Sequence, residues 1–409
     1  MSRDILIVAY HFPPILQSSG LHRTVAFAEQ LAAAGSNVTV LTITQNALPA
    51  ISDDGMDDVP SSVRVVRAWG LDTTRHLALA GKYPGWLAIP DRYQTWIRPA
   101  VFIGKRLLKR MHKPVIFSTF PVSSAHEIAL RLSTKTRVPW VADFRDPMHV
   151  PGETSKTLEK LEAAAVSRAD AVVVTTPATR DLFSGRYGPA VREKVSVIPN
   201  GYGRTVRQVA ASEAKSPSCA PNPQPLLLLH SGSVYGEFRN PSALFVAIAE
   251  LRDAGDLAEG DIEVVFRGAT LAPAVAEKLE QLKLGSLVNV LPMAAHSEAI
   301  QEMARAHAYL LLQGSQFNAQ VPAKVYEYIA MRRPILALTD AVGATGKLLA
   351  DIPASQIADM QDAGAIKRGL MALIEQVKAD PTSRGLTHDV TSFDRQAGAR
   401  HLVDIVNKL

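Results

Sequence analysis

The sequence predicts an α/β protein with two doubly wound parallel sheets, and three observations lead to this fold class. Short apolar runs alternate with segments of helical periodicity along nearly the whole chain, which is the pattern of βαβ units. The alternation stops in a stretch rich in Ala, Ser, Pro and Gln and then begins again. The chain has 409 residues, a length typical of two domains. We therefore expect an N-terminal domain over 1–203, a linker over 204–225, a C-terminal domain over 226–393 and a C-terminal helix over 394–409, with a cleft between the domains.

The composition narrows the class of protein. Hydrophobic residues make up 47% of the chain, which predicts a well-buried globular protein. The one cysteine, Cys219, excludes an intramolecular disulfide, and neither a signal-peptide pattern nor an apolar run long enough to span a bilayer is present. We therefore expect a cytoplasmic location, either free or at the inner face of the membrane. The net charge of +5 suits an anionic small ligand or an anionic membrane surface, but it is too diffuse to indicate nucleic acid.

The first βαβ unit has an unusually long loop. A buried strand is expected over 5–9 and a helix over 21–34, ended by Gly35. No G-x-G-x-x-G follows the strand, which argues against a nicotinamide or flavin dinucleotide. Ser19 and Gly20 lie at the helix start, where backbone N–H groups bind phosphate. Plain capping by Ser19 explains the same residues equally well.

Residues 98–113 have the pattern of a basic amphipathic helix. One interpretation is contact with an anionic membrane surface. The other is a surface helix whose apolar side packs on the sheet while its lysines and arginines face water, and we favour this for the apolar side because a βαβ layer needs it.

Charged residues gather after a strand expected over 140–142. Asp143, Arg145 and Asp146 follow it directly, and His126 lies in the first turn of the preceding helix. Because ligands bind beyond the carboxyl ends of parallel strands, Asp143, Asp146 and His126 are candidates for acid–base or hydroxyl-binding roles. The alternatives are an Asp–Arg ion pair that braces a loop and a histidine that packs or caps.

In the second half, an expected strand over 308–312 leads through a polar loop to a helix that starts at Pro322. The first N–H groups of this helix, from Ala323 onward, would face a ligand with the positive end of the helix dipole. Lys324 adds a charge, and Glu327 is placed to accept hydrogen bonds from sugar hydroxyls. A phosphate site beside a hydroxyl site suggests a nucleotide or nucleotide sugar, although an ordinary capped helix has the same pattern.

At these residues the sequence resembles the family-4 retaining glycosyltransferases of the GT-B fold. The resemblance implies two Rossmann-like domains that face a central cleft, with the C-terminal helix crossing back to the first domain. It also implies metal-independent transfer of a sugar, without a cofactor, from a nucleoside diphosphate to a hydroxyl of a glycan or lipid-linked acceptor in surface polysaccharide or glycoconjugate synthesis. The motifs that carry it are 10–14 with 18–23, 142–147, 197–201, 231–233 with 239–241, and 321–328 with 333–336.

The resemblance also implies roles for single residues. Arg239 neutralises the diphosphate leaving group, Glu327 binds the ribose and Met293 lies where the family places the base. The catalytic candidates are Arg239, Lys324, Asp143 and His126. The donor-binding candidates are Ser19, Gly20, Ser233, Arg239, Met293, Gln316, Pro322, Ala323, Lys324 and Glu327, and the acceptor-binding candidates are His11, Arg145 and Asp146.

Two positions depart from the family pattern. Ala319 stands where the first glutamate of the E-x7-E pattern is usual, and Ser233 stands where many members have a second arginine. The sugar contact then falls to Gln316 or to backbone N–H groups, and one diphosphate contact to Lys324. Two other functions stay open: a sugar-nucleotide epimerase of the same fold, and a non-catalytic subunit that binds a sugar nucleotide.

Overall fold

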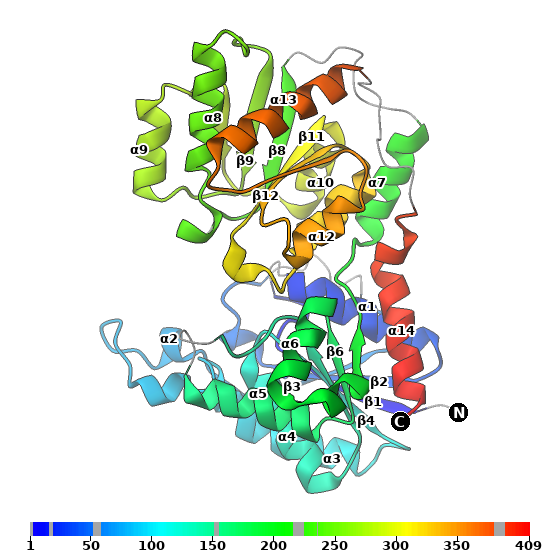
Figure 1. Cartoon of the computed structure of the whole chain (residues 1–409). Coiled ribbons are helices and arrows are strands. Elements are labelled where there is room, and N and C mark those ends of the chain that lie inside the picture. The colour runs from blue at the N-terminus through cyan, green and yellow to red at the C-terminus, as the bar shows by residue number, and fades with distance from the viewer. Residues whose placement is uncertain are drawn as a thin grey trace. The chain divides into compact units, whose positions relative to one another are not determined.

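The computed structural model describes residues 3–15, 19–51, 59–150, 155–215, 225–234, 236–379 and 389–409. The chain forms two compact units (Figure 1). The first unit comprises Met1–Pro199 and Arg395–Leu409, and the second comprises Asn200–Asp394.

The first unit is built on a parallel sheet with the strand order β3-β2-β1-β4-β5-β6-β7. Its central strands are apolar on both faces because helices cover both sides. The strands are β1 (Asp4–Val8), β2 (Asn37–Ile43), β3 (Arg64–Ala68), β4 (Val115–Thr119), β5 (Trp140–Phe144), β6 (Ala171–Val174) and β7 (Val195–Val197). The helices are α1 (Ser19–Ala33), α2 (Thr73–His76), α3 (Ile97–Leu108), α4 (Ser123–Thr136), α5 (Lys156–Arg168), α6 (Pro177–Tyr187) and α14 (Arg395–Asn407), with 3₁₀ turns η1 (Gln45–Ala47), η2 (Gly85–Ala88), η3 (Gln94–Trp96) and η4 (Pro189–Lys194).

The second unit repeats this plan with a parallel sheet in the order β10-β9-β8-β11-β12-β13. Its strands are β8 (Leu226–Ser231), β9 (Ile262–Arg267), β10 (Val288–Leu291), β11 (Ala308–Gln313), β12 (Ile335–Thr339) and β13 (Ser355–Ala358). Its helices are α7 (Arg204–Lys215), α8 (Ser242–Asp253), α9 (Pro273–Gln281), α10 (His296–Arg305), α11 (Ala323–Met331), α12 (Ala344–Ala350) and α13 (Ala363–Ala379), with 3₁₀ turns η5 (Gly236–Arg239), η6 (Ser315–Phe317) and η7 (Thr391–Phe393). The predicted fold class, two Rossmann-like doubly wound domains, is confirmed.

The strand order reverses once in each sheet. In the first sheet the reversal lies between β1 and β4, and in the second it lies between β8 and β11. At such a point the loops from the two neighbouring strands leave in opposite directions, so a crevice opens beyond their carboxyl ends. Ligand-binding residues are therefore expected in the loops after β1, β4, β8 and β11.

The C-terminal helix returns to the first unit, as the resemblance implied. Helix α14 packs beside α1 and buries Ala399, Leu402 and Val406 in the core of that unit.

The predicted linker over 204–225 is wrong for its first half. Residues 204–215 form α7, which packs against α10 and α11 and so belongs to the second unit. Residues 216–224 lie outside the described residues, as does Cys219. The composition of this segment predicts a solvent-exposed linker. Val206 of the helix is nevertheless only 1% exposed and lies in the core of the second unit.

The predicted basic helix corresponds to α3. Ala100, Gly104 and Leu108 are buried against the sheet and α4, which confirms the predicted packing of the apolar side. Arg98, Arg106 and the residues just after the helix are exposed. None of the helices in the described ranges combines the length and the apolarity that a bilayer-spanning segment needs.

We predict that Leu310→Ala in β11 lowers the free energy of unfolding by about 2 to 5 kcal/mol. Leu310 is fully buried in the second sheet, and truncation removes apolar contacts and leaves a cavity. Urea unfolding followed by circular dichroism measures the change. The same type of substitution at Leu79, which is 85% exposed, should change stability by less than about 0.5 kcal/mol. Equal losses in the two variants would contradict this description of the core.

Candidate functional site

The loops after β8 and β11 are tied together at the strand reversal of the second sheet. The backbone N–H of Ser231 donates to the hydroxyl of Tyr328 in α11, with 2.9 Å between nitrogen and oxygen. Tyr328 is 1% exposed and stacks on Tyr309 of β11 with 4.3 Å between ring centroids. The N–H of Gly314 donates to the carbonyl of Phe238 at 2.9 Å. The loop that carries Arg239 and the loop that leads into α11 therefore share one edge of the sheet.

Helix α11 begins at a residue whose side chain makes no capping hydrogen bond to the helix backbone. Pro322 is the N-cap, with φ −59° and ψ 140°, so the predicted start at Pro322 is one residue early. No side chain of the cap accepts a bond, and the first turn has no acidic residue. The backbone N–H groups of Ala323 and Lys324 thus lie at the positive end of a nine-residue helix, a suitable place for an anion.

Arg239 and Lys324 converge on the same edge. Both influence His230, the buried histidine at the end of β8, whose pKa falls to about 4 chiefly through burial and also through these two cations. Arg239 donates through Nη1 to the carbonyl of Ser233 at 3.3 Å, which fixes the guanidinium beside the first loop. The second unit therefore presents two positive side chains and one helix N-terminus together.

Glu327 is paired with Lys324 one turn along the helix. The distance between Lys324 Nζ and Glu327 Oε2 is 2.8 Å, and the Glu327 side chain is 10% exposed. The carboxylate predicted to bind ribose hydroxyls thus lies on the same side of α11 as the predicted phosphate ligand. A nucleotide there would change the partners of both side chains.

The position predicted for the base lies further along the same sheet. Met293 follows β10 and is 72% exposed, and its Cα lies 3.7 Å from where a Cβ on Gly268 would stand. Gly268 directly follows β9 and has φ +74°, a conformation that glycine adopts without strain. Of the remaining donor candidates, Ser233 is half-buried and Gln316 is exposed, both in the loops at this edge.

In the first unit, the structure brings three predicted residues together. A Cβ on Gly20 would collide with Nη1 of Arg145 and would lie 3.0 Å from Nδ1 of His11. The start of α1, the loop after β1 and the end of β5 therefore meet at one point. Burial and the Arg145 charge lower the pKa of His11 to about 4, so its imidazole is neutral at pH 7. The side chain of Ser19 lies outside the described part.

Asp143 has a bracing geometry rather than a catalytic one. The side chain is fully buried, and its carboxylate accepts bonds from Arg23 Nη2 at 2.8 Å and from Thr119 Oγ1 at 2.8 Å. Arg23 also donates to the carbonyls of Ile198 and Pro199 at 3.0 Å each. Arg23 was not expected as this partner from the sequence, and its pairing with Asp143 argues against an acid–base role for the carboxylate.

His126 lies in the core. It is fully buried, and its Nδ1 is 3.0 Å from Ser118 Oγ, which also accepts a bond from Trp140 Nε1 at 2.8 Å. The rings of Phe144 and Trp140 lie edge-on to it, with centroids 4.5 and 6.0 Å away. Burial lowers the pKa of His126 to about 3, and Nε2 has no hydrogen-bond partner among the described residues. Because no substrate atom can reach this enclosed ring, the structure argues against His126 as a catalytic group.

A carboxylate that no sequence pattern indicated holds the loop after Asp146. Glu162 of α5 is fully buried and accepts bonds from the N–H groups of Met148 and His149, and from Arg186 Nη1 at 2.8 Å. Burial raises the pKa of Asp146 and lowers that of Arg145, while each charge opposes the shift of the other. Glu162 lies in a helix with several other charged residues, so no local sequence pattern distinguishes it from a glutamate on the solvent-exposed side of that helix.

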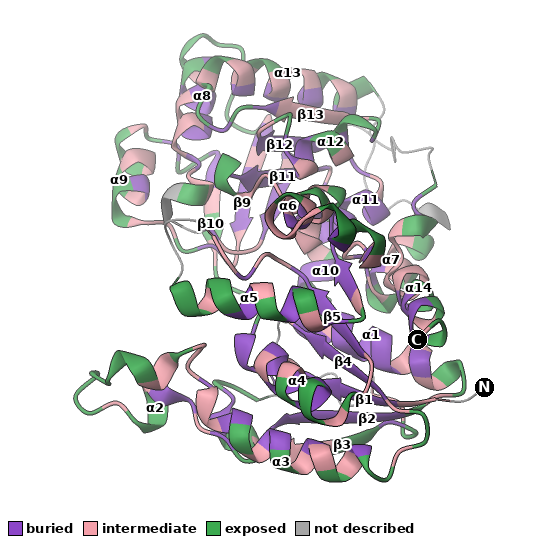
Figure 2. Cartoon of the chain, turned by 60° about the horizontal axis from the view of Figure 1, so that its bottom comes forward, coloured by how far each residue is buried: buried purple, intermediate pink, exposed green. Residues whose placement is uncertain are grey.

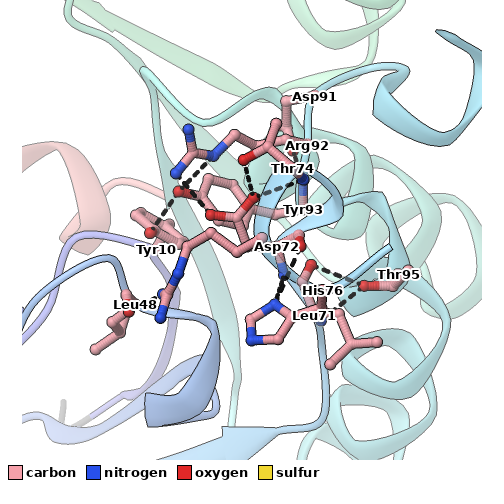
Figure 3. Close-up of polar contacts among 11 residues, drawn as sticks. Tyr10, Leu48, Leu71, Asp72, Thr74, His76, Asp91, Arg92, Tyr93 and Thr95 are labelled. Carbon is pink, nitrogen blue, oxygen red and sulfur yellow. Dashed lines mark hydrogen bonds and ion pairs between the residues drawn. The ribbon is translucent and has the colours of Figure 1, made fainter. Parts of the chain in front are cut away.

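A second missed network fixes the segment between β3 and α3 on the same edge (Figure 3). Tyr10, just after β1, donates through its hydroxyl to the Tyr93 hydroxyl at 2.7 Å, and Arg92 Nε donates to the same oxygen at 3.0 Å. Arg92 Nη2 also pairs with the fully buried Asp72 at 2.6 Å. Burial and the bond to Tyr93 raise the pKa of Tyr10, so it stays a neutral donor.

Comparisons with known proteins agree with this architecture. Residues 20–201 match the family model of a glycosyl transferase 4-like domain. Glycogen synthase of Mycobacterium tuberculosis (strain CDC 1551 / Oshkosh) is 25% identical over 204 residues, and this match spans 48% of each chain, about half the length of that relative.

Similar solved structures extend over the whole chain. Sucrose-phosphate synthase from Thermosynechococcus elongatus superposes with a TM-score of 0.67 at 17% identity, covering 99% of this chain and 98% of that one. Anabaena HepE in complex with UDP and glucose has a TM-score of 0.66 at 14% identity, with full coverage of both chains. At these identities the similarity shows the fold, which is that of the GT-B architecture.

We predict that His126→Phe makes the protein less sensitive to acid. Because the pKa of folded His126 is about 3 and the usual value is about 6.5, only the unfolded chain takes up this proton between those values. Stability is therefore lost as pH falls through this window, by about 2 kcal/mol at about pH 5.

The variant should lose about 2 kcal/mol less than the parent between about pH 7.5 and about pH 5 in urea unfolding. His112→Phe, at an exposed histidine, serves as the control and should behave as the parent does. If His126→Phe retained the whole acid loss of the parent, the account of the buried imidazole would be wrong.

Proposed function

We propose that this chain, whose residues 20–201 match the glycosyl transferase 4-like domain, transfers a sugar from a nucleoside diphosphate to a hydroxyl acceptor with retention at the anomeric carbon. The observation that carries the proposal is that Arg239, Lys324 and the α11 N-terminus lie at the strand reversal of the second sheet, where hydrogen bonds from Ser231 to Tyr328 and from Gly314 to Phe238 join their loops. All three stabilise negative charge, and a departing diphosphate is where negative charge develops in this reaction.

The proposed role of the second unit is to hold the donor and receive the leaving group. Arg239 and Lys324 are fixed before the reaction by contacts with Ser233 and Glu327, so they need little reorganisation as charge develops. On donor binding, Lys324 would exchange Glu327 for a phosphate oxygen, and Glu327 would accept bonds from the ribose. Met293 would then lie against the base.

In this proposal the leaving phosphate takes the proton of the attacking hydroxyl on the same face of the sugar. The sugar–oxygen bond to the diphosphate breaks, the bond to the acceptor oxygen forms, and the configuration is retained. A protein nucleophile is not required, as the family resemblance implies. The positive groups at the site are protein side chains and backbone, so we expect that a chelator leaves the rate unchanged.

The proposed role of the first unit is to bind the acceptor. His11, Arg145 and Asp146 remain acceptor-binding candidates, and Gly20 lets the Arg145 guanidinium lie directly on the start of α1. Neutral His11 can accept a hydrogen bond from an acceptor hydroxyl. Asp143 and Glu162 hold this surface in place. We propose a glycan or lipid-linked acceptor, used in the cytoplasm for surface polysaccharide or glycoconjugate synthesis.

Two other proposals use the same donor site. A sugar-nucleotide epimerase would convert the donor without any acceptor, and a binding subunit would hold the donor without converting it. Ala319 and Ser233 stand where the family usually has a glutamate and many members have a second arginine. The loss of these two charged side chains favours the binding subunit. The separating experiment is product analysis by chromatography with UDP-, GDP- and dTDP-sugars, each with and without glycan and prenyl-phosphate-linked acceptors.

Transfer predicts nucleoside diphosphate and an elongated acceptor in equal amounts, only when the acceptor is present. A changed sugar nucleotide with donor alone would indicate the epimerase. Binding without any conversion across the panel would indicate the subunit.

We predict that Arg239→Ala weakens binding of the nucleoside diphosphate by roughly 10- to 150-fold, since hydrogen bonds to charged groups contribute about 1.5 to 3 kcal/mol. Isothermal titration calorimetry measures this directly. Lys378→Ala is the matched control, because Lys378 is exposed in the last turn of α13, which runs back to the opposite edge of the sheet. Unchanged affinity in Arg239→Ala would remove this side chain from the donor site.

A further inference from the structure

A loop between β3 and α3 exposes large apolar side chains. Nine large hydrophobic residues of the first unit stand out as exposed among the described residues, and six of them lie within residues 69–89. Leu79 is 85% exposed and Trp86 is 68% exposed. Exposed apolar clusters of this kind mark interaction surfaces. The six residues are Trp69, Leu77, Leu79, Tyr83, Trp86 and Ile89.

The loop is closed at its base by contacts within the chain. The Asp72–Arg92 ion pair joins its two ends, and the N–H of Thr73 donates to the carbonyl of Arg92 at 2.8 Å. Tyr93 then rests on Tyr10, with ring centroids 4.1 Å apart. Figure 3 shows these side chains clustered at the base. We call residues 73–91 the apolar loop; Trp69 lies just before it and the other five exposed residues lie within it.

The tip of the apolar loop is also braced. The backbones of Leu79 and Lys82 exchange two hydrogen bonds of 2.9 and 3.0 Å across a two-residue turn. Ala80 and Gly81 in this turn have φ of +50° and +75°, which is the geometry of a tight hairpin. Thr73 Oγ1 donates to the carbonyl of Leu87 at 2.7 Å across the loop. The apolar side chains are therefore held outward by an ordered backbone, and Figure 2 shows the segment around α2 projecting from the first unit with little burial.

The charge of this part of the chain indicates the partner. Residues 69–113 contain nine lysine and arginine side chains and two aspartates, a net charge of +7 in a chain whose net charge is +5. Both aspartates are used internally: Asp72 pairs with Arg92, and Asp91 accepts bonds from the N–H and hydroxyl of Ser124 at the start of α4. No acidic side chain of the segment thus offsets its exposed basic residues.

We propose that the apolar loop, together with the basic residues of α3 and of the turn that follows it, docks this protein on an anionic lipid bilayer. Tryptophan and tyrosine with flanking basic residues are the side chains that favour the interface between lipid headgroups and acyl chains. Leu79 and Trp86 enter this interface, while Arg98, Arg106 and Arg110 contact the headgroups. This proposal rests on the proposed function, because docking would bring a lipid-linked acceptor close to the edge of the first sheet at Tyr10.

The four tryptophans make the test direct. Trp96 and Trp140 are fully buried, whereas Trp69 is 53% exposed and Trp86 is 68% exposed. Any change of tryptophan fluorescence on adding vesicles therefore reports on Trp69 and Trp86. The full chain is mixed with vesicles of phosphatidylcholine, with and without phosphatidylglycerol, at low and high salt. Binding is measured by sedimentation, and insertion by the blue shift and by protection from acrylamide.

We expect salt-sensitive binding to the phosphatidylglycerol vesicles with a blue shift. The double variant Leu79→Ser with Trp86→Ser should bind at least about tenfold more weakly and lose most of the shift, since both residues leave the interface. Arg106→Glu with Arg110→Glu should also lose at least about tenfold, because each basic residue near an anionic surface contributes about fivefold. Trp86→Phe should keep the binding while losing much of the fluorescence change.

Val342→Ser, at a residue 70% exposed in the second unit, is the control and should behave as the parent does. Salt-sensitive binding without a fluorescence change would overturn insertion of the loop. Equal binding to neutral vesicles would overturn the electrostatic part. No binding to either vesicle by the folded protein would overturn the proposal and assign the surface to a protein partner. Nucleotide binding is measured without lipid, so its failure is distinguishable from each of these outcomes.

Discussion

The reversal of strand order in each sheet is the constraint on which the candidate site depends. Parallel strands need long crossover connections, and these place every loop that follows a strand at one edge of the sheet. Where the order reverses, between β1 and β4 and between β8 and β11, two such loops diverge and leave their polar groups accessible. His11 and Arg239 lie in loops of this kind, one in each unit, although no local feature of their sequences is alike.

The polar residues behind these edges have a different task. Asp143, Glu162 and Asp72 are fully buried carboxylates, and each is paired with an arginine. Removing one partner of such a pair leaves an uncompensated buried charge, which is strongly destabilising. The pairs therefore fix the loops in place, and the groups that meet a substrate are the less enclosed side chains in front of them.

Local patterns were sufficient for part of this description. The start of α11 follows from a strand, a polar loop and a proline within a short stretch, and Lys324 and Glu327 follow from helical spacing. The role of Asp143 did not follow, because its partner Arg23 is 120 residues away in the sequence. The burial of His126, in helix α4, depends on Phe144 and Trp140, which belong to strand β5.

Two segments show why composition misleads. Residues 204–215 resemble a linker, but tertiary packing against α10 and α11 makes them a helix. The apolar loop has no sequence periodicity that would predict its structure. It is ordered by contacts that join its two ends at Asp72 and Arg92. In both cases the deciding interaction is non-local, so no window of sequence contains it.

The central claim is that the edge formed by the loop after β8 and the start of α11 binds a nucleoside diphosphate. Amide hydrogen exchange of the whole chain, with and without UDP, GDP and dTDP, tests it most directly. One of the nucleotides should slow exchange at Ala323, Lys324 and the described residues of 231–239, because the phosphates would occupy their N–H groups. Protection confined to other segments, or no protection by any of the three in the folded protein, would contradict the account.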